Sequence, residues 1–241
     1  MSFSIIIPAF NEEKYLARTL ECIHRAKEFL KDRDARAVEL LVIDNNSTDR
    51  TVGVARNSGA KVFSEPIHNV AKVRNTGARA ASGDILIFID ADTLIPETLL
   101  WRISQTMSDP ACAGGSVDTD YRPARLLLRL YLRVWRILGK LIGMAQGATQ
   151  FCRRSIYQSL GGYDETLYIG EDVDFYWRLR RTAKKLGQKV SFLRDIRVIP
   201  SCRRFNQWPL WKTLIWTNPI IILLFQRRRE AWHGWYQAPP R

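Results

Sequence analysis

The chain has 241 residues, 46% of them hydrophobic, and a formal net charge of +13 at pH 7. It is long enough to bury the core of one α/β domain, and we expect an appendage beside that domain. The four cysteines stand far apart without a CxxC pair, so the sequence gives no indication of a disulfide framework or a zinc site. We expect buried thiols in a reducing compartment.

Positive charge is concentrated near the C-terminal end. Residues 175–241 hold 15 Lys and Arg against 2 Asp and Glu, whereas residues 1–118 hold 14 against 16. A basic segment of this kind is typical of proteins that meet phosphate-bearing substrates, anionic membrane surfaces or nucleic acid. The charge alone does not distinguish these partners.

Strands and helices alternate in the first part of the sequence. Residues 3–8 and 38–43 are apolar runs typical of buried strands, and residues 60–63 predict a short third strand. Asn11 is the expected N-cap of a helix that opens with Glu12. The alternation predicts a mostly parallel, Rossmann-like sheet flanked by helices. The first apolar run is too short for a signal peptide, so we expect folding in the cytoplasm.

Residues 69–93 form the centre of this predicted fold. They predict a helix of small residues, a glycine break, and a buried strand at 85–89 that ends on Asp90-Ala91-Asp92. Open α/β sheets bind ligands at the carboxyl ends of their strands, so the two carboxylates indicate a ligand site. A cation held by one or two carboxylates keeps positions that substrate phosphates can fill, and we therefore expect Mg²⁺ or Mn²⁺.

Other side chains should gather at the same edge of the sheet. The turn after the first strand supplies Pro8, Ala9, Phe10 and Glu12. Asp44 follows the second strand and could accept a hydrogen bond from a nucleotide base, although a helix cap or an Asx-turn is an alternative role. Arg74, on the helix before the central strand, could reach a diphosphate. Three acidic loops on one edge are compatible with a nucleotide site.

The second half of the sequence adds further strands and a helix with an acidic start. Residues 112–117 and 147–154 predict two further strands. Glu171 and Asp172 open another helix, where the helix dipole stabilises acidic side chains. By itself this pattern favours plain helix capping, and a general base is the alternative role of a carboxylate held there.

Two segments combine apolar and basic residues. In a helix after Pro123, arginines recur every three or four residues beside leucines, which fits either a core helix with a solvated face or a helix on an anionic membrane. The apolar run 214–225 is broken at 217–219, too short to cross a bilayer, and flanked by aromatic residues and arginines. We expect it at a membrane interface, with a domain cover or an oligomer contact as alternatives.

Four segments, in this order, resemble inverting family 2 glycosyltransferases of the GT-A fold. They are SIIIPAFNEEKYL, VIDNNSTDRT, VRNTGARAASGDILIFIDADT and GGYDETLYIGEDVDFYWRLRR. The resemblance covers roughly residues 3–186 and implies a nucleotide-sugar donor, most often uridine-linked. It also implies that Asp90 contacts the ribose or sugar, that Asp92 binds the divalent cation, and that Asp44 lies at the base.

The resemblance assigns the remaining site residues as well. It implies that Asp172 is the catalytic base, with Glu171 as a supporting contact. Gly162 and Tyr163 are the expected acceptor-binding residues. The implied donor-binding residues are Pro8, Ala9, Phe10, Glu12, Asp44, Arg74, Asn75, Asp90, Ala91 and Asp92.

One departure from the family lies after the final predicted strand. Many relatives carry a histidine there that completes the metal site, but residues 198–205 contain none. Arg203 and Arg204 either neutralise a diphosphate instead or are surface charge. The sequence therefore identifies no third metal ligand.

These observations predict a domain organisation and a function. We expect a GT-A domain at 1–200, with a donor half at 1–118 and an acceptor half at 119–200, and a basic, Trp-rich segment at 201–241. The expected enzyme is a metal-dependent hexosyltransferase that acts on a glycan or lipid-linked acceptor. We expect it in the cytoplasm, peripherally on an anionic membrane surface, without a nucleic-acid partner. The oligomeric state is not predicted.

Two other functions fit parts of the sequence. A haloacid-type phosphohydrolase also places a DxD after an apolar strand, but it requires Thr or Val two positions beyond the second Asp, where this chain has Leu94. A protein that only binds nucleic acid or membranes would explain the basic tail with its tryptophans and leave the acidic edge unexplained. The missing Walker A and GxGxxG motifs argue against an ATPase or a dinucleotide dehydrogenase.

Overall fold

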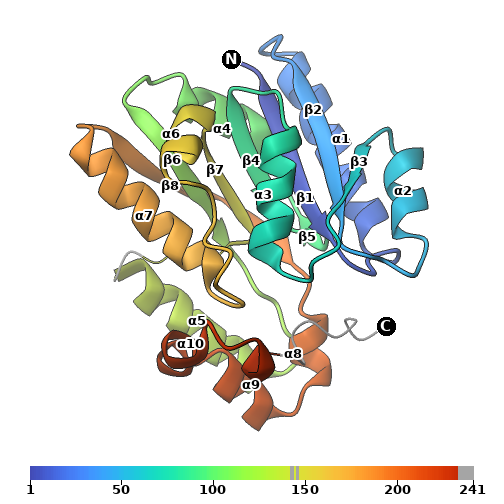
Figure 1. Ribbon diagram of the computed structural model, residues 1–241, viewed down its shortest axis with the longest axis vertical. Helices are drawn as coiled ribbons and strands as arrows, with labels where there is room; N and C mark the ends of the chain where they lie inside the picture. The colour runs from blue at the N-terminus through green and yellow to red at the C-terminus, as the bar shows by residue number, and fades with distance from the viewer. Residues whose placement is uncertain (142–143, 145–146, 233–241) are drawn as a thin grey trace.

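The computed structural model describes residues 1–141, 144 and 147–232 (Figure 1). Its centre is an eight-stranded sheet in the order β3-β2-β1-β4-β7-β6-β8-β5. The strands are β1 Phe3–Ala9, β2 Val38–Asp44, β3 Lys61–Ser64, β4 Ile85–Ile89, β5 Thr93–Leu94, β6 Cys112–Thr119, β7 Thr149–Arg153 and β8 Lys189–Pro200.

Strand direction places several loops at one edge of the sheet. Strands β1, β2, β3 and β4 are parallel, with Ala9 opposite Asp44 at the ends of β1 and β2. Strand β7 runs antiparallel between β4 and β6, with Thr149 opposite Ile89. Residues just before β7 therefore lie beside residues just after β4. The predicted mostly parallel α/β sheet is confirmed.

In the described part of the chain, six helices cover the two faces of the sheet, and the alternation of side chains along the strands explains both layers. In β1, Ile5 and Ile7 pack with α1 and α4 in one core, while Ile6 packs with α3, α6 and α7 in the other. Four cysteines are buried and free, as predicted. The helices of these layers are α1 Leu16–Lys31, α2 Thr51–Asn57, α3 Val70–Ala80, α4 Leu99–Met107, α6 Arg154–Ser159 and α7 Glu171–Lys185.

One predicted helix boundary is wrong. Helix α1 begins at Leu16 with Tyr15 as its N-cap, and Asn11 is not the cap. Asn11 instead has a positive φ of 53°, and its side-chain oxygen accepts a hydrogen bond from the Thr48 amide at 2.8 Å. The turn after β1 is thus fixed by the neighbouring loop, which leaves Glu12 outside the helix and free to face the edge of the sheet.

A second group of helices lies beyond this edge (Figure 1). It consists of α5 Leu126–Leu141, α8 Arg203–Gln207, α9 Leu210–Trp216, α10 Pro219–Phe225 and the 3₁₀ helix η1 Arg229–Trp232. Leu128 and Leu132 of α5 pack with Cys202 and Phe205 in a small core of their own. Within the described ranges, no helix combines the length and apolar character needed to cross a membrane. Residues 233–241 of the predicted C-terminal segment lie outside the described residues.

Candidate active site

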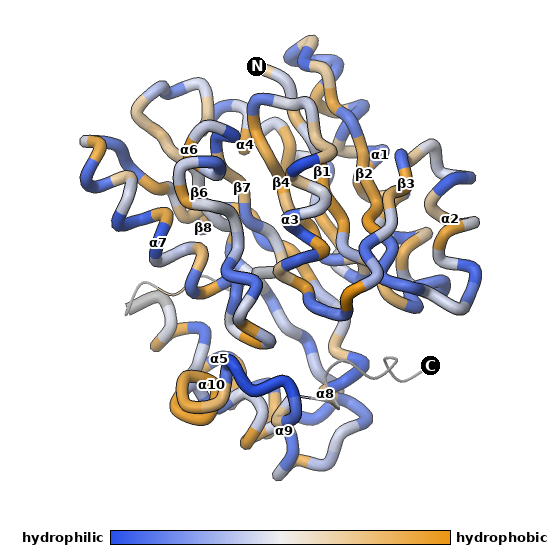
Figure 2. The backbone as a smooth tube through the Cα atoms, viewed as in Figure 1, coloured by the Kyte–Doolittle hydropathy of each residue, from blue (hydrophilic) through white to orange (hydrophobic). Residues whose placement is uncertain are grey.

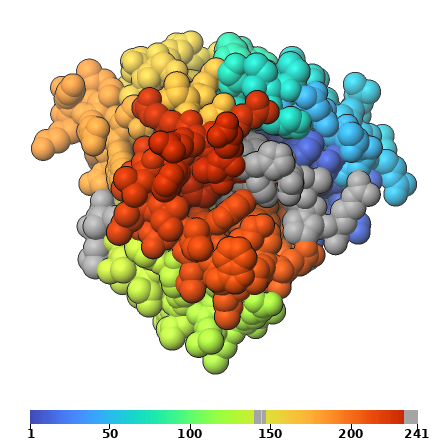
Figure 3. Space-filling view, turned by 60° about the horizontal axis from the view of Figure 1, so that its bottom comes forward, coloured from blue at the N-terminus to red at the C-terminus, as the bar shows by residue number. Residues whose placement is uncertain are grey.

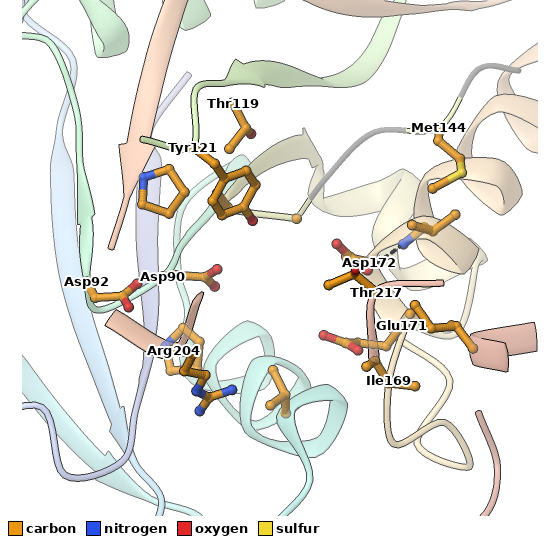
Figure 4. Close-up of a pocket in the computed structure, with 18 of the residues that line it drawn as sticks. Asp90, Asp92, Thr119, Tyr121, Met144, Ile169, Glu171, Asp172, Arg204 and Thr217 are labelled. Atoms are coloured by element: carbon orange, nitrogen blue, oxygen red, sulfur yellow. Dashed lines mark hydrogen bonds between the residues drawn. The ribbon is translucent and has the colours of Figure 1, made fainter. Parts of the chain in front are cut away.

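A cavity of about 550 Å³ lies between the carboxyl edge of the sheet and the second group of helices. Figure 4 shows Asp90 and Asp92 on one side of it, with Glu171 and Asp172 on the other. The donor-site residues predicted from the sequence that line it are Pro8, Ala9, Phe10, Glu12, Arg74, Asp90, Ala91 and Asp92. The structure therefore brings both predicted carboxylate pairs to one cavity.

Asp90 and Asp92 follow β4 directly and project into the cavity (Figure 4). Burial, and then the nearby carboxylate of Glu12, raise the pKa of Asp92 to about 7. Burial away from water disfavours the charged form of a carboxyl group, and carboxylate oxygens are the ligands that Mg²⁺ and Mn²⁺ prefer. Among the residues that the structure describes, no group of three or more His, Cys, Asp and Glu side chains is placed so that it could hold a metal ion. Two carboxylates fit a cation whose other positions are filled by phosphate oxygens.

Arg203 of α8 reaches the same acidic group from the far end of the sequence. Its guanidinium donates two hydrogen bonds to Glu12, one of them 2.7 Å from Nη1 to Oε2, and lies 3.3 Å from the Asp92 carboxylate. It also stacks over Tyr15, 4.4 Å from the ring centre. Arg203 is buried, so the surface-charge interpretation is wrong for it. Arg204 lines the cavity near Asp92 (Figure 4).

Arg74 of α3 connects the two sides of the cavity. Its Nη1 donates to Glu171 Oε1 at 2.5 Å, and its Nη2 donates to Asp90 Oδ1 at 2.9 Å. The Arg74 side chain is only 4% exposed, and its partners Glu171 and Asp90 are 12% and 35% exposed, so the pair with Glu171 is the better shielded from water. Arg74 thus holds the end of β4 against the start of α7. Its predicted contact with a diphosphate stays a prediction.

Asp172 sits in the first turn of α7, where the sequence placed it. Burial, and then the neighbouring Glu171, raise the pKa of Asp172 to about 7. A Cβ atom added at Gly147 would lie 2.5 Å from the Asp172 carboxylate, so only glycine leaves room for this side chain. Gln150 donates to the Asp172 carbonyl at 2.9 Å. Strand β7 thereby positions the candidate base.

Four predicted site residues do not line the cavity. Asp44 is buried, and its carboxylate accepts a hydrogen bond from the Ser47 amide at 3.2 Å, which is the turn-forming role considered as its alternative. The neighbouring Asn45 lines the cavity instead. The predicted contact of Asp44 with a nucleotide base stays a prediction.

The other three residues are Asn75, Gly162 and Tyr163, which contact one another outside the cavity lining. Asn75 donates to the Tyr163 carbonyl at 3.0 Å and accepts from the Tyr163 amide at 2.9 Å. Gly162 has a φ of +76°, and a Cβ there would lie 2.6 Å from the Asn75 side-chain oxygen. The buried Tyr163 hydroxyl donates to Gln150 at 3.0 Å. These residues hold the loop before α7, and their predicted roles in substrate binding stay predictions.

Sequence reasoning missed Gly147 and Tyr121 as parts of the site. Gly147 lies outside the four motifs, and its spatial neighbour Asp172 is 25 positions away. Tyr121 follows β6 and lies beside Asp90 in Figure 4. Burial, and then Asp90, raise the pKa of Tyr121, so its phenol is a neutral hydrogen-bond donor. Its position as an aromatic residue soon after a predicted strand is the sequence feature that could have identified Tyr121.

Replacing Gly147 with alanine is expected to lower kcat at least about tenfold with little change in donor affinity, because a positioned catalytic group loses efficiency when it is displaced. Steady-state kinetics and donor titration check this. Gly53, where an added Cβ meets nothing within 4 Å, provides the matched control as Gly53→Ala. Equal kcat for the two variants would contradict the packing argument.

The mostly parallel sheet with acidic loops over one cavity is the GT-A fold, as comparison with solved structures shows. A mannosyltransferase from Pyrobaculum calidifontis, solved with GDP-Man and Mn²⁺, superposes with a TM-score of 0.69 at 21% identity, over 96% of this chain and 64% of that one. The sequence model described as glycosyl transferase family 2 matches residues 4–161. The chain belongs to glycosyl transferase family 2.

Two relatives illustrate how far the similarity extends. The glycosyltransferase AglE of Haloferax volcanii is 25% identical, over 85% of this chain and 68% of that protein. The probable glycosyltransferase YdaM of Bacillus subtilis is 27% identical, over 92% of this chain and 56% of that protein. The chain spans about half to two thirds of the length of these relatives. The phosphohydrolase and nucleic-acid-binding alternatives are not favoured.

Proposed function

We propose that this protein is an inverting, metal-dependent hexosyltransferase that moves a sugar from a nucleoside-diphosphate donor, in the first place a UDP-sugar, to an acceptor hydroxyl. The observation that carries the proposal is the placement of Asp92 and Asp172 on opposite sides of one cavity. Family membership supports the donor class, and the GDP-Man of the Pyrobaculum structure makes a GDP-sugar the main alternative.

Each side of the cavity has a part in the proposed reaction. Asp172 removes the proton of the acceptor hydroxyl, and the oxygen forms a bond to the anomeric carbon while the bond to the diphosphate breaks. A single in-line displacement of this kind inverts the anomeric centre. Asp90 and Asp92 would hold the divalent cation, which as a Lewis acid would neutralise charge on the departing nucleoside diphosphate.

The acceptor side of the cavity supports a lipid-linked acceptor. Its lining includes Leu132 and Trp135 of α5 together with Ile222 and Leu223 of α10. Of these residues, Ile222 lies near Gly170, the residue before α7, since a Cβ built at Gly170 would be 3.2 Å from its side chain. Apolar lining in the cavity that holds the candidate base suits an acceptor that carries a hydrocarbon chain beside its hydroxyl group. A glycan without a lipid is the alternative acceptor. The expected cytoplasmic location stays a prediction.

Nucleotide-sugar binding should be visible as thermal stabilisation. A ligand present at 100 times its Kd stabilises the native state by about 2.7 kcal/mol, which for a chain of this size is a rise of roughly 5–10 °C in Tm. We expect this rise for one UDP- or GDP-sugar in a panel, with Mn²⁺ present and not without it. A panel in which no donor raises the Tm with Mn²⁺ would contradict the proposed function.

The turnover number should depend on pH through Asp172. Its pKa is raised to about 7, so the fraction in the ionised, basic form falls about tenfold per pH unit below 7. We expect kcat to fall with that slope as the pH drops and to level off above 7. Rates measured at saturating donor between roughly pH 5 and 9 check this. The acid limb should disappear in the residual activity of Asp172→Asn, and persistence of the limb would assign it to another group.

A further inference from the structure

Exposed apolar side chains are concentrated on the helices beyond the sheet edge. In the described part of the chain, fourteen of the eighteen large apolar residues that are exposed belong to α5, α9 and α10. We call this set the apolar surface: Leu126, Leu127, Leu130, Val134, Ile137, Leu138, Leu210, Trp211, Leu214, Ile215, Ile220, Leu223, Leu224 and Phe225. A concentration of this kind marks a binding surface, whereas single exposed apolar residues are ordinary.

Helix α5 has two apolar faces, and only one of them is buried. Leu128 and Leu132 pack against α8 in the small core. Leu126, which is 75% exposed, and Leu130, which is 59% exposed, lie on the other side of the helix, and the same stripe continues through Val134 and Ile137 at helical spacing. Of the α5 side chains that the structure describes, the small core therefore buries Leu128 and Leu132 only, whereas six large apolar residues of α5 are exposed.

Helix α10 has no buried residue, although every position of its sequence PIIILLF is apolar. Trp211 on the neighbouring α9 is 63% exposed. The apolar colouring of α10 stands out in Figure 2, and Figure 3 shows the C-terminal helices and α5 together on one face of the molecule. Burial of this surface requires a partner outside the described part of the chain.

Positive charge borders the apolar surface. On α5, the exposed Arg129 and Arg133 lie between the buried face and the exposed apolar face. Exposed arginines at 227–229 follow α10 directly. An apolar face bordered by arginines, with tryptophan beside it, matches the interface of an anionic bilayer, where apolar groups enter the acyl boundary and cations meet lipid phosphates.

We infer that α5, α9 and α10 form a docking surface for an anionic lipid bilayer. A second copy of this chain suits the surface less well, because a symmetric contact would bring the bordering arginines of both copies together. The docking itself is independent of the transfer reaction. Trp135 of α5 and Leu223 of α10 also line the cavity, so a docked protein would turn the cavity towards the bilayer. The use of this orientation for a lipid-linked acceptor rests on the proposed function.

Vesicle flotation tests this inference directly. We expect the protein to float with vesicles of phosphatidylcholine and phosphatidylglycerol, and to float much less with phosphatidylcholine alone. The double variant Leu130→Gln with Leu224→Gln changes two exposed residues outside the cavity lining and should lower vesicle partitioning about tenfold or more. Leu186→Gln is the matched control, since Leu186 is 57% exposed at the far end of α7, and it should float like the unchanged protein.

The charge component has its own variants. Arg133→Gln with Arg229→Gln should reduce the preference for phosphatidylglycerol severalfold, while Arg56→Gln, an exposed position on α2, should not. A protein that stays soluble with both kinds of vesicle would overturn the inference, as would equal flotation of the leucine double variant. A third result would also overturn it: sedimentation shows a concentration-dependent dimer, the leucine double variant abolishes that dimer, and no vesicle binding is seen.

A donor-site variant separates this inference from the proposed function. Asp92→Ala should lose nucleotide-sugar binding and still float like the unchanged protein, because Asp92 lies in the cavity and not on the apolar surface. Donor-induced thermal shifts are measured without lipid, so failure of flotation and failure of donor binding are independent results.

Discussion

Asp172→Asn is expected to lower kcat by about 10²–10⁴-fold and to leave donor affinity nearly unchanged. Removal of the base withdraws roughly 3–5 kcal/mol of transition-state stabilisation, because each factor of ten in rate corresponds to about 1.4 kcal/mol. Asparagine keeps the size of the side chain, so the contact with Gly147 is preserved. Steady-state kinetics and calorimetric titration of the donor give the two quantities separately.

Asp164→Asn is the matched control for this experiment. Asp164 lies on the loop before α7, outside the cavity lining, and its Oδ1 accepts from the Thr166 amide at 2.9 Å, a bond that the asparagine oxygen can also accept. Its kcat should stay within a factor of a few of the unchanged protein. A fall in kcat as large for Asp164→Asn as for Asp172→Asn would show that the loss comes from the loop and not from the base.

Asp92→Ala is expected to abolish metal-dependent donor binding. A cation at a phosphate contributes several kcal/mol, so the donor Kd measured with Mn²⁺ should rise by about 10²-fold or more and become insensitive to chelation. Calorimetry with and without Mn²⁺ measures this. The result also distinguishes the two carboxylates, since equal donor affinity for the Asp92 and Asp172 variants would refute their separate assignments.

The opposite end of the same strand provides the control. Asp84 lies just before β4, and it accepts a hydrogen bond from the Ser2 amide at 2.7 Å, far from the cavity lining. Asp84→Ala therefore removes a carboxylate from the same segment without touching the site. Its donor Kd should remain dependent on Mn²⁺ to the same extent as in the unchanged protein.

The central sheet could be predicted because each of its strands is encoded by a short run of neighbouring residues. The five apolar residues of β4 are buried on both faces, and only a continuous apolar run gives that result. The carboxylates that follow are placed by the direction of the strand alone. The start of α7 at Glu171 followed likewise from two acidic residues at a helix terminus.

The features that could not be predicted depend on contacts between residues far apart in the sequence. Arg203 meets Glu12 across 191 positions, and no periodicity or spacing encodes such a pair. Asn11 failed as an N-cap because the loop after β2 bonds its side chain. For Asp44, both roles were compatible with the sequence, and the backbone of the following turn decided which hydrogen bond forms in this structure.

Arg203 forms its ion pairs with residues that are synthesised much earlier, so the donor pocket is completed late in translation. A nascent chain that has emerged only as far as residue 200 contains Glu12 and Asp92 but not the guanidinium that lies between them. Two carboxylates in a half-buried pocket repel each other until that countercharge arrives. The donor half therefore gains its final electrostatic balance only after α8 has been translated, and the predicted boundary at residue 200 would cut through the network that provides it.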